Sequence, residues 1–297
     1  MSIKNALNSA LDTWHQSIED APQLLVAVSG GLDSMLLLTL LAERVNPERL
    51  TAVHINHGIS ENAENWQAQV AQYCQQLGVV LVTEKITLMH SGEGLEAEAR
   101  NARYAVFERL LEDNGLLFLG HHANDQVETV LYRLMRGAGV KGLSGMPNKR
   151  VLGKGYLVRP FLDCAKSALE NEAQLRNLVW IEDESNLDHR FDRNYLRNSV
   201  IPKISQRWPD YSQSIKQTAE LSSESYQLAK ELAVIDLQAL DLKEERAGWS
   251  ISIKAFLMLS PLRQKNILRY WSELQRLVPP SMTIIDEVLT SVVSARQ

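Results

Sequence analysis

The segment Ser29–Ser34 reads S-G-G-L-D-S, interrupts an apolar run and is the strongest candidate for a ligand-binding loop. Adjacent glycines at Gly30 and Gly31 allow backbone torsions that are closed to other residues, so several amide N–H groups can point at one ligand. Serine hydroxyls flank the glycines on both sides. The segment is expected to join a strand to a helix N-terminus, which favours phosphate binding, with Asp33 as the nearby carboxylate for Mg²⁺.

Two better-known phosphate loops do not fit this segment. The Walker loop carries a lysine after its last glycine, whereas no lysine occurs between residues 24 and 50. The dinucleotide fingerprint G-x-G-x-x-G needs a third glycine, which is absent. Without a loop lysine, charge on a leaving pyrophosphate would have to be met by backbone dipoles, hydroxyl groups and Mg²⁺.

A second polar cluster is expected in residues 120–129, which read G-H-H-A-N-D-Q-V-E-T. His121, His122, Asp125 and Glu128 can meet at the end of a strand and in the first turn of the helix that follows, where Asp125 could bind a metal ion or an amine. A His-Asp helix cap without a chemical role is the alternative. Zinc hydrolase chemistry is less well supported, because the chain contains no H-E-x-x-H.

Arginines recur in residues 95–104, which read L-E-A-E-A-R-N-A-R-Y. Arg100 and Arg103 are three residues apart and would share one face of a helix, with Tyr104 beside them. A role in the site and an ordinary surface ion pair between Glu96 and Arg100 both remain open from the spacing alone.

Strand-like and helical segments alternate through the first half of the chain. Strands are expected at residues 24–28, 50–56, 79–84 and 116–120, and helices at 34–44, 61–77, 95–112 and 125–136. The alternation predicts an α/β fold in which a parallel-sheet, nucleotide-binding domain carries helices on both faces. Ligands bind such sheets beyond the carboxyl ends of the strands, where Ser29–Ser34, His54–Gly58 and residues 120–129 fall.

The composition of the chain changes near Pro209. From Asp210 to Ala247 there is neither glycine nor proline, and Glu, Gln, Ser, Leu and Ala dominate, which predicts helix. Helices are also expected at 261–277 and 281–293, the last capped by Ser281, with a short extended piece at 249–253. We therefore expect a catalytic domain over residues 1–209 and a smaller all-helical domain over residues 210–297.

Composition argues against several classes of protein. The 297 residues contain no apolar stretch of membrane-spanning length and begin with a polar, amphipathic segment, so the protein is expected to be cytoplasmic, with no membrane span and no secretion signal. Cys74 and Cys164 are far apart in the chain, which argues against a disulfide framework, a zinc site or a sulfur relay. The net charge of −5 argues against general attraction to nucleic acid, so any RNA site must be local.

One stretch of the chain is strongly basic. No Asp or Glu occurs from Thr129 to Leu162, which contains Arg133, Arg136, Lys141, Lys149, Arg150, Lys154 and Arg159. A second basic run contains Arg190, Arg193, Arg197, Lys203 and Arg207, opposed only by Asp192. A charge run usually marks a solvated face, but cations without acids in a Gly-rich, loop-like stretch favour a surface that contacts phosphates.

Several motifs resemble a known family. S-G-G-L-D-S is similar to the pyrophosphate loop (PP-loop) of the N-type ATP pyrophosphatases. In order along the chain, S-G-G-L-D-S, H-I-N-H-G, L-E-A-E-A-R-N-A-R-Y, the run from Gly120 to Met146, V-R-P-F-L and the run from Trp180 to Pro202 together resemble the tRNA(Ile)-lysidine synthetase family. The most specific of these motifs are R-G-x-G-x-x-G-L from Arg136 and E-D-x-S-N with its later R-N-x-x-R. The remainder resembles a helical tRNA-binding domain of that family less distinctively.

The resemblance implies a two-step reaction with ATP and Mg²⁺ as cofactors. ATP would adenylate the O2 oxygen of the wobble cytidine in an isoleucine tRNA with a CAU anticodon, releasing pyrophosphate. The ε-amino group of free L-lysine would then attack C2, AMP would leave, and the base would become lysidine.

The resemblance also implies roles for individual residues. ATP would be bound by Ser29, Gly30, Gly31, Leu32, Asp33, Ser34, His54 and Arg103. The residues implied in catalysis are Asp33 (also as the metal ligand), Asp125, Glu128, His121, His122 and Arg100. The anticodon stem-loop would be held by Arg136, Lys141, Arg159, Arg193, Asn194 and Arg197. Arg100 and Arg103 would meet phosphate or the adenylated base, and of the two adjacent histidines only one is expected to face the site.

The chain departs from the family at two places. The family commonly shows two successive aspartates where this chain has Asn124-Asp125, and many members continue beyond residue 297, so C-terminal domains are expected to be missing. A homodimer is left open. Two alternatives also remain: another tRNA-modifying PP-loop enzyme such as a thiolase, which would usually need paired cysteines or an iron–sulfur site, and a non-catalytic RNA-binding protein.

Overall fold

The computed structural model describes residues 3–58, 62–86, 95–182, 190–246, 248–275, 277 and 280–293. The strands are β1 (Leu24–Ala27), β2 (Leu50–Asn56), β3 (Val80–Lys85), β4 (Leu116–Phe118), β5 (Lys149–Leu152), β6 (Gly155–Val158), β7 (Lys243–Glu245) and β8 (Gly248–Ser250). The α-helices are α1 (Ile3–Asp12), α2 (His15–Asp20), α3 (Leu32–Ala42), α4 (Ala63–Leu77), α5 (Leu95–Leu110), α6 (Ala123–Met135), α7 (Val140–Leu143), α8 (Lys166–Leu175), α9 (Asp192–Tyr195), α10 (Ile201–Arg207), α11 (Tyr211–Ala239), α12 (Ile253–Leu257), α13 (Pro261–Leu274) and α14 (Met282–Glu287). Short 3₁₀ and π segments cover Pro47–Arg49, Leu196–Val200 and Val288–Val293.

The chain forms two compact units. The first unit contains Met1–Ala138 and Gly145–Gln217, and the second contains Gly139–Ser144 and Thr218–Gln297. Helix α11 therefore begins in the first unit and ends in the second. In the described part of both units, no helix is at once long enough and apolar enough to cross a membrane. The predicted boundary between two domains at residues 209 and 210 differs from the boundaries of these compact units. That residues 1–209 and 210–297 each fold independently stays a prediction.

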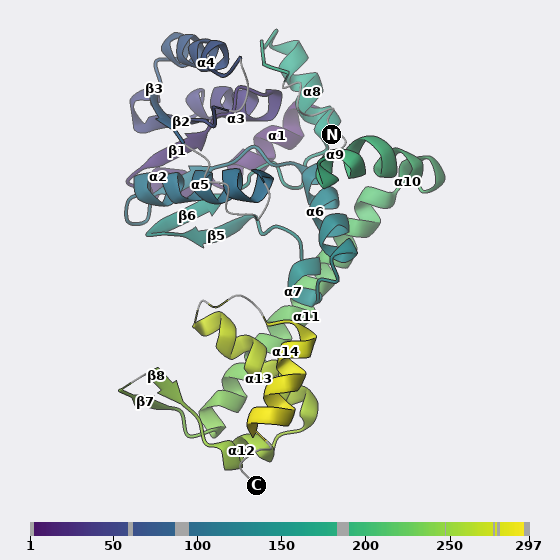
Figure 1. Ribbon diagram of the computed structural model, residues 1–297. Helices are drawn as coiled ribbons and strands as arrows, with labels where there is room; N and C mark the ends of the chain where they lie inside the picture. Colours follow the sequence, from purple (N-terminus) through teal and green to yellow (C-terminus); the bar gives the residue numbers. More distant parts are fainter. Residues whose placement is uncertain are drawn as a thin grey trace. The chain divides into compact units, whose positions relative to one another are not determined.

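The first unit is built on one six-stranded sheet with the order β3-β2-β1-β4-β6-β5, and Figure 1 shows helices along it. All neighbouring strands are parallel except β5, which pairs antiparallel with β6 at the edge. The predicted α/β fold is thus confirmed. The expectation that the basic stretch is loop-like is wrong in part, because β5 and β6 form a hairpin there, closed by the two-residue turn Gly153-Lys154 with Gly153 at φ 54°.

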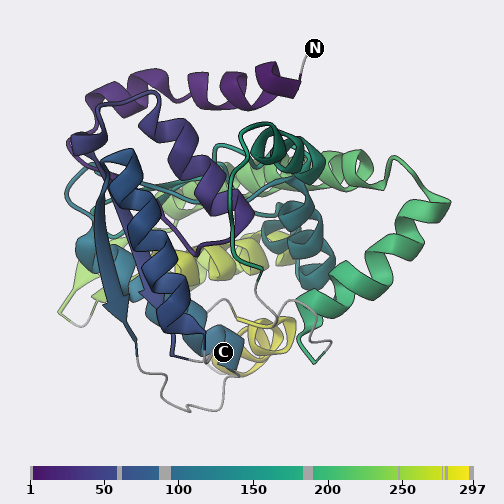
Figure 2. The same ribbon diagram turned by 90° about the horizontal axis from the view of Figure 1, so that it is seen from above.

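Alternate residues of the parallel strands enter two different cores. Leu24 and Val26 of β1 belong to a core that includes α1, α3 and α8, whereas Leu25 points to a second core with Val106 and Phe107 of α5. Helix α3 is buried around most of its circumference from Ser34 to Leu41, which explains its nearly continuous apolar sequence. Helices α3 and α8 pack side by side, as Figures 1 and 2 show. The sheet is therefore covered on both faces, as a parallel sheet requires.

The second unit is mainly helical. Its core contains Ala233, Leu237, Phe256 and Ile267, contributed by α11, α12 and α13. The description of this part as all-helical needs one correction, because β7 and β8 form a short antiparallel hairpin that includes the extended piece expected near Trp249. The predicted cap is confirmed: the Ser281 hydroxyl accepts a hydrogen bond from the Ile284 amide at 3.3 Å.

The end of β4 lies against the beginning of α3. A Cβ atom added to Gly120 would stand 2.8 Å from the backbone oxygen of Asp33 and 3.1 Å from the backbone nitrogen of Ser34. Backbone atoms cannot swing aside as a flexible side chain does, so only glycine permits this approach. The contact brings the PP-loop helix to the strand that precedes His121 and His122.

We expect Gly120→Ala to lower the free energy of unfolding by about 1–3 kcal/mol, because the added methyl group must displace the first turn of α3. Urea denaturation measures the loss. Gly139→Ala is the matched control, since a Cβ there would meet no described atom within 4 Å; as an N-cap change of a four-residue helix it should cost less than Gly120→Ala, about 1 kcal/mol. Equal losses for the two variants would contradict the close approach.

Candidate active site

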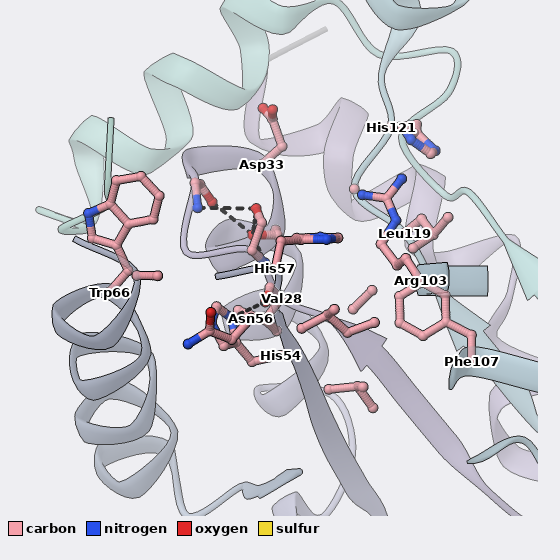
Figure 3. A pocket seen from close by; sticks show the side chains of 18 of the residues that line it. Val28, Asp33, His54, Asn56, His57, Trp66, Arg103, Phe107, Leu119 and His121 are labelled. Carbon is pink, nitrogen blue, oxygen red and sulfur yellow. Dashed lines mark hydrogen bonds between the residues drawn. The ribbon is translucent and has the colours of Figure 1, made fainter. Parts of the chain in front are cut away.

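A cavity of about 530 Å³ opens at the carboxyl edge of the sheet in the first unit. The ends of β1, β2 and β4 form its floor, and it is lined by residues of the PP-loop, of His54–Gly58 and of Gly120–His121. Figure 3 shows Trp66 of α4 on one side and Arg103 and Phe107 of α5 on the other, with Asp33 between them. The three clusters predicted to converge therefore share one cavity.

The PP-loop holds its shape through its own serines. The Ser34 hydroxyl donates to the Gly31 carbonyl at 2.9 Å and lies 3.2 Å from the Ser29 hydroxyl, which accepts from the Gly31 amide at 3.3 Å. Gly30 adopts a φ of 95°, as its predicted role requires. Helix α3 starts at Leu32, two residues earlier than expected, so Gly31 is its N-cap and Asp33 lies in its first turn. This places helical N–H groups beside the cavity, an arrangement that suits phosphate.

His122 joins the two aspartates of the site. It is the N-cap of α6, where its Nδ1 accepts from the Asp125 amide at 3.3 Å and its own amide donates to Asp125 Oδ2 at 3.0 Å. Because Nδ1 is an acceptor, the ring proton is on Nε2, which lies 3.6 Å from Asp33 Oδ2. The capping role that the sequence left open is thus present, and the same ring lies beside Asp33.

Asp33 keeps one oxygen available for a ligand. Among the described residues its Oδ1 is buried without a hydrogen-bond partner. Burial raises the pKa of the Asp33 carboxyl above 3.8, His122 opposes that shift, and the charge of Asp125 adds to it. No three His, Cys, Asp or Glu side chains of the described chain converge as a metal-binding group. Asp33 nevertheless fits Mg²⁺, which commonly takes one or two carboxylates together with substrate phosphates and waters.

His121 points away from this pair, toward Arg159. Its Nδ1 accepts a hydrogen bond from Arg159 Nε at 3.0 Å. Burial lowers the pKa of His121 to about 3; the nearby charge of Asp125 opposes the shift, whereas Arg159 and Arg103 reinforce it. His121 therefore lines the cavity as a neutral group and is a weak base.

Glu128 is held by a single arginine. Its side chain is 2% exposed, and its two oxygens accept from Arg197 Nε at 2.6 Å and Nη2 at 2.9 Å. The same Nη2 lies 3.5 Å from Asp125 Oδ1, and Arg197 lines the cavity. The pKa of Arg197 is raised, first by the hydrogen bond that it donates to Glu128. With both oxygens engaged, Glu128 is better suited to positioning than to accepting a proton.

The end of β2 contributes His54, which the sequence analysis assigned to ATP binding, and the cavity is also lined by Asn56, His57 and Trp66, to which it gave no individual role. His54 Nδ1 lies 2.8 Å from the Val28 carbonyl, and burial lowers the pKa of this histidine. Asn56 holds the turn through the Gly58 amide, while His57 and Trp66 line the cavity. Trp66 follows H-I-N-H-G closely in the sequence, which is the one signal that could have identified it. The spacing of apolar residues in α4 does not show that Trp66 faces the cavity.

The other predicted residues are distributed more widely. Leu32 packs against the apolar core, and Asn124 accepts from the Lys166 amide at 3.1 Å, so the departure at position 124 serves a structural bond. Arg159 is 3% exposed, Arg193 donates to Thr129, and Arg136 lies over Tyr132 at the end of α6.

Lys141 belongs to the second unit, where it contacts Glu273 at 2.8 Å. Arg100 contacts Tyr104, Arg103 lines the cavity, Asn194 lies in α9, and the side chain of Glu96 is outside the described residues.

We expect Arg197→Met to destabilise the protein by about 3 kcal/mol, because it leaves the Glu128 carboxylate buried without its cation. Adding Glu128→Gln to that variant should recover part of the loss in urea denaturation. Lys154→Met is the control: its ion pair with Asp113 spans 3.8 Å between well-exposed side chains, so it should cost less than about 1 kcal/mol. Simple additivity of Arg197→Met and Glu128→Gln would contradict a coupled pair.

A carboxyl whose pKa is raised on folding weakens the fold once it ionises. Asp33→Asn should therefore raise the Tm of the ligand-free protein at pH 7. The gain should fade as the pH falls toward 3.8, where the wild-type carboxyl is protonated too. Thermal unfolding between pH 3.5 and pH 8 checks this expectation, with the exposed Asp113→Asn as control. A gain that is constant with pH would mean that ionisation of Asp33 is not its source.

Two family models match the chain. The PP-loop domain matches residues 2–204, and the TilS substrate binding domain matches residues 251–297. The first match contains every described residue of the cavity described above.

Curated proteins named tRNA(Ile)-lysidine synthase are similar to most of this chain. One from Pseudomonas putida is 46% identical over 85% of this chain and 60% of its own length, and one from Coxiella burnetii is 41% identical over 91% and 60%. The chain thus spans about 60% of the length of these relatives. Among solved structures, the U34-tRNA thiolase NcsA from Methanococcus maripaludis shares the fold, with a TM-score of 0.57 at 15% identity over 73% of this chain and 80% of that one. With the PP-loop model covering more than half of its residues, the chain belongs to the PP-loop family.

Proposed function

We propose that this protein ligates lysine to C2 of the wobble cytidine of a CAU-anticodon isoleucine tRNA at the expense of ATP, giving lysidine. The observation that carries the proposal is the shared cavity, which is lined by the PP-loop and by two aspartates, Asp33 and Asp125. Relatives named tRNA(Ile)-lysidine synthase support the choice of reaction.

The first step would transfer an adenylyl group. The pyrophosphate part of ATP would lie on the N-terminus of α3, where the amides of the first turn from Leu32 have no acceptor within the helix. Mg²⁺, bound through Asp33, would supply positive charge to the phosphates. The cytidine O2 attacks the α-phosphorus, the bond to pyrophosphate breaks, and pyrophosphate leaves with the electron pair. Arg103, at the opposite wall from Trp66, is placed to contact the adenylated base.

The second step needs a site for a cationic amine. Asp33 and Asp125 provide two carboxylates at the cavity. The positive charge of Arg197 opposes them, but Arg197 also pairs with Glu128. The surplus of negative charge favours the ammonium form of lysine when it binds. The amine must lose a proton before it attacks C2, and Asp125 is the carboxylate we assign to accept it. AMP then leaves with the former O2 oxygen, and Glu128 and Arg197 hold Asp125 in place.

Sulfur transfer, the rival reaction, is poorly supported by the cysteines. Cys74 and Cys164 are both buried, and burial raises the pKa of each thiol to about 11. A thiol of that kind is protonated near neutral pH and is a poor nucleophile or metal ligand. The non-catalytic alternative would give no reason for an unpartnered Asp33 oxygen beside a PP-loop.

We expect radiolabelled lysine to enter a CAU-anticodon isoleucine tRNA when the chain is incubated with ATP and Mg²⁺, and not to enter the same tRNA with the wobble cytidine replaced by uridine. Label absent from the first tRNA, or equal in both, would overturn the proposed reaction.

In the same assay Asp33→Asn and Asp125→Asn should lower kcat by about 100-fold or more, since each removes a group that acts on the reacting atoms. Their tRNA dissociation constants should stay within about twofold, because neither carboxylate is assigned to a phosphate of the RNA. Asp113→Asn, on an exposed side chain, is the control and should keep wild-type turnover. Near-normal turnover of either site variant would remove that residue from the mechanism.

A further inference from the structure

The Gly30 carbonyl group of the PP-loop is bonded to a residue from outside the loop. The backbone amide of Ile181 donates a hydrogen bond to it at 2.9 Å. The bonds described above for the hydroxyl groups of Ser29 and Ser34 stay within the loop. Ile181 belongs to the same unit but lies far later in the chain, so its bond to Gly30 forms only when the first unit has folded.

The side chain of Ile181 also stands against Gly30. A Cβ atom added to Gly30 would lie 2.5 Å from Ile181 Cδ1 and 3.4 Å from Val70 Cγ2, so these two side chains fill the space that a side chain at position 30 would take. Gly30 has a φ of 95°. Glycine can adopt this torsion, but it can adopt many others as readily. Contacts from outside the loop are therefore needed to keep it there.

The segment that ends in Ile181 is anchored at its beginning as well. Residues Asn177–Ile181, which we call the return segment, follow α8, which packs against α3. Asn177 has a φ of 51°, and the amides of Asn177 and Leu178 donate to carbonyls of α8, as in a Schellman motif. Immediately before it, Arg176 pairs with Glu43 at the end of α3. The return segment thus leads from the end of α3 back to the PP-loop at its start.

A second cavity, of about 610 Å³, borders the return segment. Its other walls come from α3 and α4 and include Thr39 and Tyr73, whose hydroxyl groups lie 2.7 Å apart. The return segment is therefore bordered by open space on this side instead of by close-packed side chains, and Val179 within it is 76% exposed. Ile181, at its end, is the residue through which it contacts Gly30.

The bond from Ile181 has a consequence for the amides of the loop. The C=O and N–H groups of one trans peptide point in opposite directions, so fixing the Gly30 carbonyl also fixes the Gly31 amide, which donates to Ser29 Oγ at 3.3 Å. Gly31 is the N-cap of α3. The Gly30–Gly31 peptide therefore sets how the chain enters the helix whose first amides lie beside the active-site cavity.

We propose that Ile181 is a positioning residue for the PP-loop, whose backbone amide and Cδ1 hold the Gly30–Gly31 peptide in the conformation that binds the pyrophosphate part of ATP. This inference rests on the proposed function, which assigns pyrophosphate to the loop. Ile181 itself does not touch the nucleotide. Its effect is to keep the loop in the binding conformation before ATP arrives, so that less of the binding free energy is lost in ordering two adjacent glycines.

The test compares Ile181→Ala with Ile251→Ala in the full chain. Both isoleucines are partly buried, but Ile251 packs against the core of the second unit. Isothermal titration calorimetry measures the dissociation constants of ATP and of AMP, each with Mg²⁺. A loop that holds its binding conformation only about a fifth of the time binds about fivefold more weakly, so Ile181→Ala should raise the Kd of ATP about fivefold or more. AMP lacks the pyrophosphate, so its Kd should stay within about twofold. Ile251→Ala should leave both constants at their wild-type values.

Two results would overturn the inference: a wild-type Kd for ATP in Ile181→Ala, or equal losses of ATP and AMP affinity, which would indicate general damage to the cavity. Where Ile181→Ala lowers the Tm more than Ile251→Ala does, Ile181→Val replaces it. That variant removes only Cδ1 and should still raise the Kd of ATP at least about twofold, without changing that of AMP. Failure of the proposed reaction is distinguishable. Wild-type protein that incorporates no lysine, together with an ATP-specific loss in Ile181→Ala, would contradict lysidine formation and support the role of Ile181.

Discussion

One guanidinium, that of Arg197, connects the carboxylates of Glu128 and Asp125 at one corner of the sheet. Glu128 accepts two hydrogen bonds from Arg197, and Asp125 Oδ1 lies 3.5 Å from Arg197 Nη2. The charge of Asp33 also contributes to the raised pKa of Arg197. Like charges that are removed from water repel one another, and a shared cation reduces that repulsion. Since Asp33 follows β1, Asp125 and Glu128 follow β4, and Arg197 comes from a much later segment, the balance exists only once the fold has brought the three segments together.

The two adjacent histidines divide two tasks between them. His122 caps α6 next to Asp125 and has its Nε2 3.6 Å from Asp33 Oδ2, whereas His121 accepts a hydrogen bond from Arg159. The pair thus separates an acidic corner around Asp33 and Asp125 from a basic one at Arg159. A single residue step in a strand end turns the side chain to the opposite side, and this alternation is what keeps the two electrostatic environments apart.

Much of the fold was predictable because its signals are local. The glycines and serines of the PP-loop fix their own backbone, and continuous apolar runs mark strands that are buried on both faces. The hairpin β5–β6 was not predicted, because its glycines suggest loop and only its pairing with β4 makes it part of the sheet. Nor could spacing show that Arg197 would hold Glu128 or that Arg159 would be buried, since both depend on contacts across dozens of residues. Position 141 illustrates the same limit, because its lysine packs with residues more than eighty positions later.

The six residues Gly139–Ser144 belong to the second unit although they lie in the middle of the first unit's sequence. The chain therefore passes between the units three times, at 138–139, 144–145 and 217–218, instead of once. A protease that cuts only within α11 would leave α7 on the N-terminal product, which would then carry one segment of the second unit. A chain shortened to residue 217 would keep α7 but lose Glu273 and Tyr226, the groups that Lys141 contacts. Truncation at a single point thus leaves Gly139–Ser144 in the fragment without the residues that they pack against. A minimal fragment of the first unit would therefore also need a substitute for Gly139–Ser144.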